Sequence, residues 1–334
     1  MNISGWKSNV IRNPKRIAIP IMTNPGIEIL DYKIIDAVKD GKIHYEAIKA
    51  LNELYPSAAS CVIMDLTVEA EAFGAEIHFE ENEVPTVVGR LVCDMESVEK
   101  LQVPDMTKGR VAEYLLANKL VAENLKDRPA FAGCIGPFSL AGRLYDMTEI
   151  LMDCYVEPEI VNILLQKCTD FLINYCLELK KTGVQGVIMA EPAAGLMSNE
   201  GCSEFSSTFI KQLVEKVQDD RFMLILHNCG NTGHCTEAMV ETGAFGFHFG
   251  NKIDMINALE NTPKNALVMG NIDPVSCFKY ASAQDVESIT TDLLERTHSY
   301  PNFVLSSGCD VPSGVPRENI DAFYAALNKY NQSY

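Results

Sequence analysis

Short apolar segments, each followed by a polar residue or a glycine, recur along the whole chain. Each has the length of a β-strand that is buried on both faces, and the segments between them have the periodicity of amphipathic helices, as in 158–183 and 282–297. Strands that alternate with helices build parallel sheets from βαβ units. The pattern therefore predicts an α/β protein. The eight predicted strands are residues 17–22, 61–66, 131–136, 186–192, 222–229, 245–250, 266–272 and 303–309.

Eight strands favour a closed (β/α)₈ barrel, a TIM barrel, over a doubly wound open sheet, which is the alternative. We expect one barrel domain over residues 1–334, with an N-terminal extension of about residues 1–16, because a chain of this length can bury one large core. Residues 85–93, PTVVGRLVC, are predicted to form an inserted hairpin or an edge strand.

Composition limits the partners of this chain. The formal net charge of −17 argues against a nucleic acid or an anionic membrane as partner, because phosphate neutralisation needs clustered lysine and arginine. The N-terminus has no apolar segment typical of a signal peptide, and no run of apolar residues is long enough to span a bilayer. We therefore expect a cytoplasmic protein with no membrane partner, and the sequence leaves a homodimer open.

In such barrels the active site is built at the C-terminal ends of the strands. Polar residues and cysteines that lie at or just beyond the predicted strand ends are therefore candidate site residues. They are Asp65, Glu191, His227, Cys229, His248, Asn271, Asp273 and Cys309.

The stretch LILHNCG (224–230) places a histidine and a cysteine two positions apart at a strand end. Side chains two apart on a strand point to the same side, so His227 and Cys229 are expected to converge. Imidazole nitrogen and thiolate sulfur are preferred ligands of Zn²⁺, and a catalytic zinc usually has three protein ligands and one open position. Cys309, which also follows a strand, is the candidate third ligand. The competing interpretation is that these cysteines only fill the core, as most of the eleven are expected to do.

At this point the chain resembles the uroporphyrinogen decarboxylase superfamily, and within it the methylcobamide:coenzyme M methyltransferase branch. The resemblance implies a (β/α)₈ barrel with zinc bound by His227, Cys229 and Cys309. It also implies that a methyl group is exchanged between a corrinoid (methylcobamide) on a partner protein and a thiol such as coenzyme M. The motifs that carry it are MDLTVEAEAFG (64–74), VPD (103–105), IGPFSLAG (135–142), AEPAAGLMS (190–198), ILHNCG (225–230), GNIDP (270–274) and SSGCDVPSGVPRENI (306–320).

Several positions depart from the decarboxylases themselves. Those enzymes resemble MRQAGR where this chain has MTNPGI (22–27), so the arginines that bind substrate carboxylates are missing. They resemble NLGHG where this chain has SSGCD (306–310), and their active-site tyrosine aligns with Arg143. Asp65 does match the aspartate that holds the pyrrole N–H groups. Uroporphyrinogen decarboxylase activity is therefore the less favoured alternative.

One position departs from the methyltransferase pattern. These enzymes often carry a glutamate about twenty residues after the His-x-Cys motif as a fourth ligand in the resting state, and this chain has Asn251 there. His248 and Glu191 are the candidate replacements. The methyl donor and acceptor therefore stay open, and two alternatives remain: a methyltransferase that demethylates a methoxy or methylamine compound onto the corrinoid protein, and a zinc-bearing barrel that only binds that protein.

The other polar residues at the predicted strand ends are candidates for catalysis or cofactor binding. Asp65 and Glu191 are predicted to act in catalysis, facing the substrate or supporting the ligands, with a loop carboxylate as the alternative for Glu191. His248, Asn271 and Asp273 are predicted to bind the cofactor, although the last two residues also suit turns closed by Asx hydrogen bonds. His44, His78 and His298 are expected to be solvated.

Overall fold

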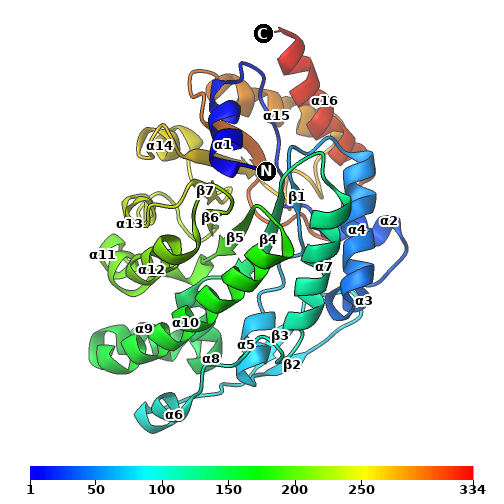
Figure 1. Ribbon diagram of the computed structural model, residues 1–334. Helices are drawn as coiled ribbons and strands as arrows, with labels where there is room; N and C mark the ends of the chain where they lie inside the picture. Colours follow the sequence, from blue (N-terminus) through cyan, green and yellow to red (C-terminus); the bar gives the residue numbers. More distant parts are fainter. Residues whose placement is uncertain (334) are drawn as a thin grey trace.

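The computed structural model describes residues 1–333, and its central feature is a curled parallel sheet of seven strands (Figure 1). All six neighbouring pairs in this sheet are parallel. The α/β class predicted from the alternating pattern is therefore confirmed. In sheet order the strands are β1 (Ser60–Cys61), β4 (Ala130–Ile135), β5 (Gly186–Ala190), β6 (Met223–Asn228), β7 (Gly246–Phe249), β8 (Leu267–Ile272) and β9 (Phe303–Ser307).

The first predicted strand, 17–22, is not a regular strand. Ala18 forms a single parallel bridge with Leu305 of β9, and its carbonyl accepts a hydrogen bond from the N–H of Ala58, just before β1. Pro20 has no N–H to donate, so a continuous ladder cannot form through this segment. The prediction of eight regular strands is therefore wrong, although residues 17–22 lie hydrogen-bonded to both edges of the seven-stranded sheet.

Helices connect the strands and cover the outer face of the sheet (Figure 1). Their bounds are α1 (Ile3–Arg12), α2 (Asn24–Ile29), α3 (Ile34–Lys39), α4 (Gly41–Leu54), α5 (Val68–Phe73), α6 (Met95–Lys100), α7 (Val111–Asn124), α8 (Pro137–Tyr145), α9 (Met147–Val156), α10 (Pro158–Thr182), α11 (Asn199–Cys202), α12 (Thr208–Val217), α13 (Thr236–Glu241), α14 (Met255–Glu260), α15 (Ala283–Arg296) and α16 (Arg317–Ser333), with a 3₁₀ helix η1 (Pro192–Leu196) and a π-helix η2 (Ser203–Ser207).

Two local signals in the sequence set the ends of the predicted helices. α10 begins with Pro158 at its first position and ends at Gly183, whose φ of 99° is a conformation that glycine adopts without steric cost. The side chain of Ser282 caps α15 by accepting a hydrogen bond from the N–H of Asp285. Both helices predicted from periodicity are confirmed within a residue of their expected ends.

The segment 85–93 takes part in a hairpin outside the main sheet. β2 (Glu76–His78) and β3 (Thr86–Val88) pair antiparallel and form a separate two-stranded sheet. The prediction of an inserted hairpin is confirmed in part, because residues 86–88 form one of its strands and the other, Glu76–His78, precedes the predicted segment. This hairpin brings Val84 and Pro85 to the pocket described below.

The interior of the curled sheet holds its own apolar core, and the N-terminal helix covers one end of it. Ile3 is fully buried there, and the ring of Trp6 packs edge-on against Phe131 of β4 at 5.9 Å between centroids. The N–H of Ile3 also donates to the carbonyl of Asp220, in the loop before β6. The predicted extension is thus a helix packed onto the sheet interior. In Figure 1 this helix, in dark blue, lies across the strands.

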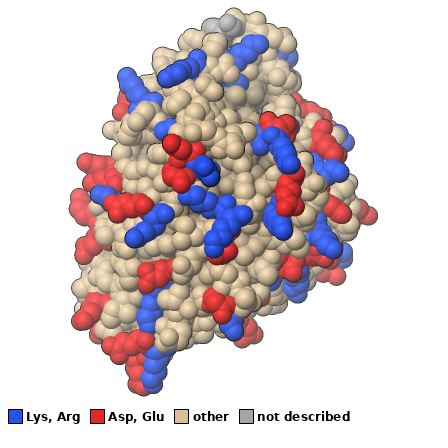
Figure 2. Space-filling model, in the orientation of Figure 1, with Lys and Arg blue, Asp and Glu red and all other residues tan. Residues whose placement is uncertain are grey.

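Acidic and basic side chains are interspersed over the face seen in Figure 2, with no broad field of one sign. The formal net charge is −17, so acidic groups exceed basic ones over the molecule as a whole. No helix among residues 1–333 is both long and apolar enough to cross a membrane.

Candidate metal centre

The alternation of side chains along β6 brings His227 into the interior. Met223 and Ile225 belong to the interior core, and His227 continues the same face of the strand, with 1% of its surface exposed. Cys229 follows two residues later, just beyond the end of β6. The predicted convergence of the two side chains therefore results from the period of a strand.

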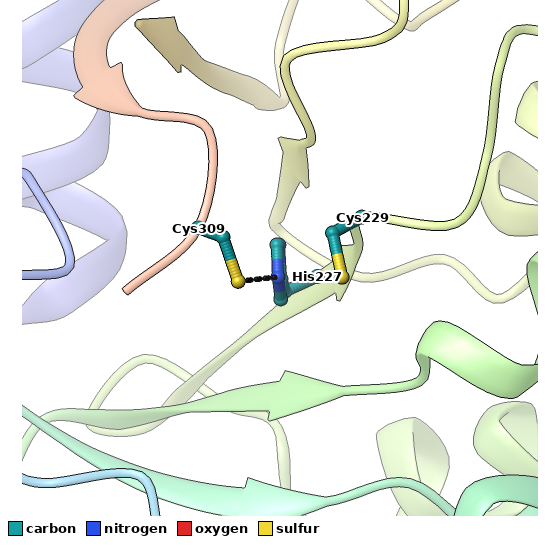
Figure 3. Close-up of side chains that lie close together, drawn as sticks. All are labelled: His227, Cys229 and Cys309. Carbon is teal, nitrogen blue, oxygen red and sulfur yellow. Dashed lines mark hydrogen bonds between the residues drawn. The ribbon is translucent and has the colours of Figure 1, made fainter. Parts of the chain in front are cut away.

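Cys309 completes a three-residue cluster with these side chains. It follows β9, and the ligand atoms of His227, Cys229 and Cys309 all lie within 4.8 Å of one another. The Sγ atom of Cys309 is 3.7 Å from Nε2 of His227, and Figure 3 shows the three side chains pointing toward a common centre. Eight of the eleven cysteines are buried, as expected for core residues, whereas Cys229 and Cys309 are partly exposed.

The chemistry of this donor set fits zinc, with one nitrogen and two sulfurs at a spacing that one ion can bridge. A hydrogen bond from the Cys309 thiol lowers the pKa of Cys229 to about 7, and the same contact raises the pKa of Cys309. Cys229 is therefore the more acidic of the two thiols, and Cys309 keeps its proton. A bound cation would replace that proton, because metal ligands are thiolates.

A chain of hydrogen bonds behind His227 fixes which ring nitrogen carries its proton. Nδ1 of His227 is 2.7 Å from Nδ1 of His248, Nε2 of His248 is 2.8 Å from Oγ of Ser306, and that hydroxyl donates to the carbonyl of Ile19 at 2.8 Å. The Ile19 carbonyl can only accept, so Ser306 donates to it and accepts from Nε2–H of His248. Nδ1 of His248 then accepts from Nδ1–H of His227.

This assignment leaves the lone pair of His227 Nε2 free and directed toward Cys309, as a metal ligand requires. Burial lowers the pKa of His248 well below its usual value, which keeps that ring neutral and able to accept. His248 is fully buried and does not line the pocket, so the geometry supports a role in orienting His227 rather than in contacting a cofactor.

We expect His248→Leu to weaken zinc binding roughly 10- to 100-fold while all three ligands stay in place, because the partner that orients a metal-bound histidine contributes about that much affinity. Competition with a chromogenic chelator would measure the change. His78→Leu is the control, because His78 is an exposed histidine. Equal zinc affinity in the His248→Leu variant and the wild type would contradict this role.

The cluster opens into a pocket of about 200 Å³ at the C-terminal ends of the strands. Besides the three candidate ligands, polar groups of Asp65, Arg143 and Asp310 line this pocket. Asp310 accepts hydrogen bonds from the N–H and hydroxyl of Thr23 and from Asn24, which attaches the segment after residue 22 to the end of β9. Neither Arg143 nor Asp310 was among the residues assigned a role from the sequence.

Asp65 lies at the pocket, but its carboxylate is already occupied. One oxygen accepts from the N–H and hydroxyl of Thr67, at 3.0 and 2.8 Å, and the other accepts from the Arg110 guanidinium and, at 3.2 Å, from the hydroxyl of Tyr114. Each oxygen thus has two donors within the chain. Asp65 lies at the pocket, as expected. Its catalytic role stays a prediction.

Glu191 lies behind the pocket wall and not in it. Its carboxylate accepts from the N–H groups of Phe138 and Ser139, at 2.9 and 2.6 Å, in the first turn of α8. Its own N–H donates to the carbonyl of His227. With 1% of its surface exposed, Glu191 holds α8 against β6, and direct contact with substrate or metal is not part of this arrangement.

Asn271 and Asp273 stabilise loops. The amide of Asn271 donates to the carbonyls of Gly250 and Ile253. Asp273 accepts from the N–H groups of residues 275 and 276 and from the amide of Asn251, at 2.6 Å. The Asx-turn interpretation is confirmed for Asp273, and neither residue lines the pocket. Asn251, at the position of the missing glutamate, is likewise turned to Asp273.

Of the three histidines expected to be solvated, only His44 differs from expectation, because His78 and His298 are exposed. His44 is 1% exposed, accepts a hydrogen bond from the N–H of Ile63 at 2.9 Å, and has its pKa lowered to about 3 by burial. His298 bonds to the hydroxyl of Tyr330 at 2.6 Å. His44 therefore supports the departure of the chain from β1, where residue 63 no longer pairs with a strand, and the prediction that it is solvated is wrong.

Comparisons with known proteins place this geometry in a family. A methylcobamide:CoM methyltransferase, MtbA, from Methanosarcina acetivorans is 29% identical over 273 residues, which are 80% of this chain and 79% of that protein. A uroporphyrinogen decarboxylase from Yersinia enterocolitica is 23% identical, over 97% of this chain and 96% of that one. The solved structure of a methyltransferase from Methanosarcina mazei superposes with a TM-score of 0.88 at 22% identity, over 97% of each chain, which supports the fold.

Residues 15–330 match the uroporphyrinogen decarboxylase (URO-D) family. This range includes every strand of the sheet and all three candidate ligands, and it begins just after α1. The family predicted from the motifs is confirmed, and the chain belongs to the uroporphyrinogen decarboxylase family.

Proposed function

We propose that this protein is a zinc-dependent methyltransferase that exchanges a methyl group between the corrinoid of a partner protein and a small thiol such as coenzyme M. The observation that carries the proposal is the convergence of His227, Cys229 and Cys309 at the floor of an open pocket. The similarity to a methylcobamide:CoM methyltransferase supports the same reaction class.

In this proposal the chain supplies the ligands and the seat of the thiol. His227, Cys229 and Cys309 would hold zinc, and His248 and Ser306 would keep His227 in the tautomer that leaves Nε2 free. Zinc would supply the positive charge that lets a thiol lose its proton and stay nucleophilic at neutral pH. With the thiol proton released to solvent, the sulfur would take the methyl group from the corrinoid, and the electron pair of the cobalt–carbon bond would stay on the corrinoid. No proton is needed by that leaving group.

The open side of the pocket is where the partner would have to dock, because a protein-bound corrinoid must reach the sulfur. Holding thiol and methyl carbon in line would lower the barrier by several kcal/mol, of the order expected for well-oriented reactants. We also infer that residues 17–22, hydrogen-bonded to both edges of the sheet, complete a (β/α)₈ barrel around this site.

The state of Asp65 disfavours decarboxylation of uroporphyrinogen. That reaction would require its carboxylate to accept from pyrrole N–H groups, and four donors of this chain already occupy it. The arginines expected near residues 22–27 are also missing.

Metal analysis and methylcobalamin demethylation test the proposal together. We expect about one zinc per chain, as a single three-ligand site implies, and a thiol-dependent loss of methylcobalamin absorbance with coenzyme M. Homocysteine and a thiol-free reaction are the controls. Zinc well below one per chain would contradict the metal centre. Full zinc with no demethylation by any thiol would instead favour the transfer of methyl from a methoxy or methylamine donor to the corrinoid protein, and coproporphyrinogen formation would restore the decarboxylase.

A further inference from the structure

Arg143 is a cation in the wall of the pocket, and no group among residues 1–333 forms an ion pair with it. It lies on α8 and lines the same pocket as the three candidate ligands. Among residues 1–333, no hydrogen bond, ion pair or ring contact of its guanidinium is found. Arg143 is half-buried, and this burial lowers its pKa.

Arg110 is a buried arginine with a structural role, and its guanidinium is hydrogen-bonded within the chain. Its guanidinium donates to the carboxylates of Asp65 and Glu71, to the carbonyl of Val38 and to the hydroxyl of Thr67. Arg143 lies in the same region of the fold and has none of these partners. Partial removal of an arginine from water without a partner carries a cost, which an anion beside it would offset.

The nearby carboxylates do not supply that anion. Asp65 is neutralised by Arg110, and Asp310 is hydrogen-bonded to Thr23 and Asn24. Glu69 is 1% exposed, and burial raises its pKa to about 7, so it carries only part of a charge at neutral pH. No carboxylate oxygen lies within ion-pair distance of Arg143 among the described residues.

The helix that carries Arg143, α8, is held in place by hydrogen bonds at its first turn. Glu191 caps the first turn of the helix, and a methyl group added at Gly136 would come within 2.4 Å of that carboxylate. The close approach shows that the start of α8 packs directly against Glu191. A fixed guanidinium can bind an oxyanion through two parallel hydrogen bonds.

We propose that Arg143 binds the anionic end of the thiol substrate, which makes that substrate a short thiol with a terminal sulfonate or carboxylate. The inference rests on the proposed function and extends it to the class of acceptor. The sulfur would reach the cluster of His227, Cys229 and Cys309 while the anion meets Arg143 across a pocket of about 200 Å³. Coenzyme M, which is 2-mercaptoethanesulfonate, has both groups.

Calorimetric titration of the zinc-loaded protein, without any corrinoid, tests this directly. The two ligands are 2-mercaptoethanesulfonate and 2-mercaptoethanol, which differ only in the sulfonate. We expect the wild type to bind the sulfonate roughly 10- to 100-fold more tightly, as one or two charge-assisted hydrogen bonds imply. Arg143→Gln should bring the two dissociation constants within about threefold without changing that of 2-mercaptoethanol, and Arg143→Lys should fall between them.

Three outcomes would overturn the assignment. An unchanged preference for the sulfonate in Arg143→Gln would show that the anion binds elsewhere, and it is also the result expected if Arg143 contacts only the corrinoid. An equal loss of affinity for both thiols in Arg143→Gln and Arg143→Lys would show that Arg143 has a structural role. If the wild type binds both thiols equally tightly, the substrate does not need an anionic group, and the proposed function is left intact. Binding of neither thiol by zinc-loaded wild type would overturn the proposed function itself.

Discussion

Cys309→Ser is expected to bind zinc roughly 100- to 1,000-fold more weakly than the wild type and to lose thiol-dependent demethylation of methylcobalamin. Zinc sites in small proteins bind with about 10–16 kcal/mol from four ligands, so one ligand accounts for about 2.5–4 kcal/mol. The serine hydroxyl is nearly the same size but does not ionise near neutral pH. The measurement is zinc content after dialysis against a graded series of chelators.

Cys93→Ser is the matched control, because Cys93 is an exposed free cysteine that does not line the pocket. It should retain zinc and activity in full. Thermal denaturation of both variants without metal shows whether the fold survives, since Cys309 is only partly buried and its replacement removes no large side chain. Full zinc retention by Cys309→Ser at every chelator concentration would refute the three-ligand centre.

Arg110→Met is expected to lower the free energy of unfolding by about 3–5 kcal/mol, the usual cost of removing one partner of a buried ion pair. The side chains of Arg110 and Asp65 are 8% and 1% exposed, and the substitution leaves the Asp65 carboxylate buried without its cation. Chemical denaturation followed by circular dichroism measures the change.

The same substitution at an exposed ion pair provides the comparison. Arg296 pairs with Asp254 at 2.7 Å, with side chains 48% and 55% exposed, and Arg296→Met should cost less than about 1 kcal/mol. Equal destabilisation by the two variants would mean that the buried pair contributes no more than a solvated one. The wild-type zinc affinity should survive in Arg296→Met.

Periodicity predicted the frame of this protein because parallel buried strands leave a strong local signal. Seven of the eight predicted segments contain strands of one sheet, and the hairpin that includes residues 86–88 was separated from them correctly. The exception is the segment 17–22. Its apolar residues led to the prediction of a strand, although Pro20 has no N–H to donate to a neighbouring strand. Likewise, the segment 61–66 leaves the ladder early because Ile63 bonds to His44, a contact between distant parts of the chain.

The candidate ligands were predictable for a different reason: residues at strand ends meet regardless of how far apart they lie in the chain. That rule found His227, Cys229 and Cys309, but it could not rank the other polar residues at strand ends. Glu191 and Asp273 turned out to hold backbone N–H groups, and His248 a second imidazole. Arg110 and Arg143 follow no strand directly, so only their tertiary contacts, or the lack of them, reveal what they do.

Helix α1, which covers one end of the sheet interior, has a consequence for the kinetics of the proposed reaction. With α1 packed on one end and side chains filling the interior, the described residues leave the cluster open to the pocket at the C-terminal ends of the strands. In the proposed reaction, the thiol and the protein-borne methyl group would therefore share one entrance. A docked partner would shut it, so the thiol has to arrive first and the methylated thiol has to leave last. Steady-state turnover should accordingly follow a compulsory order of addition.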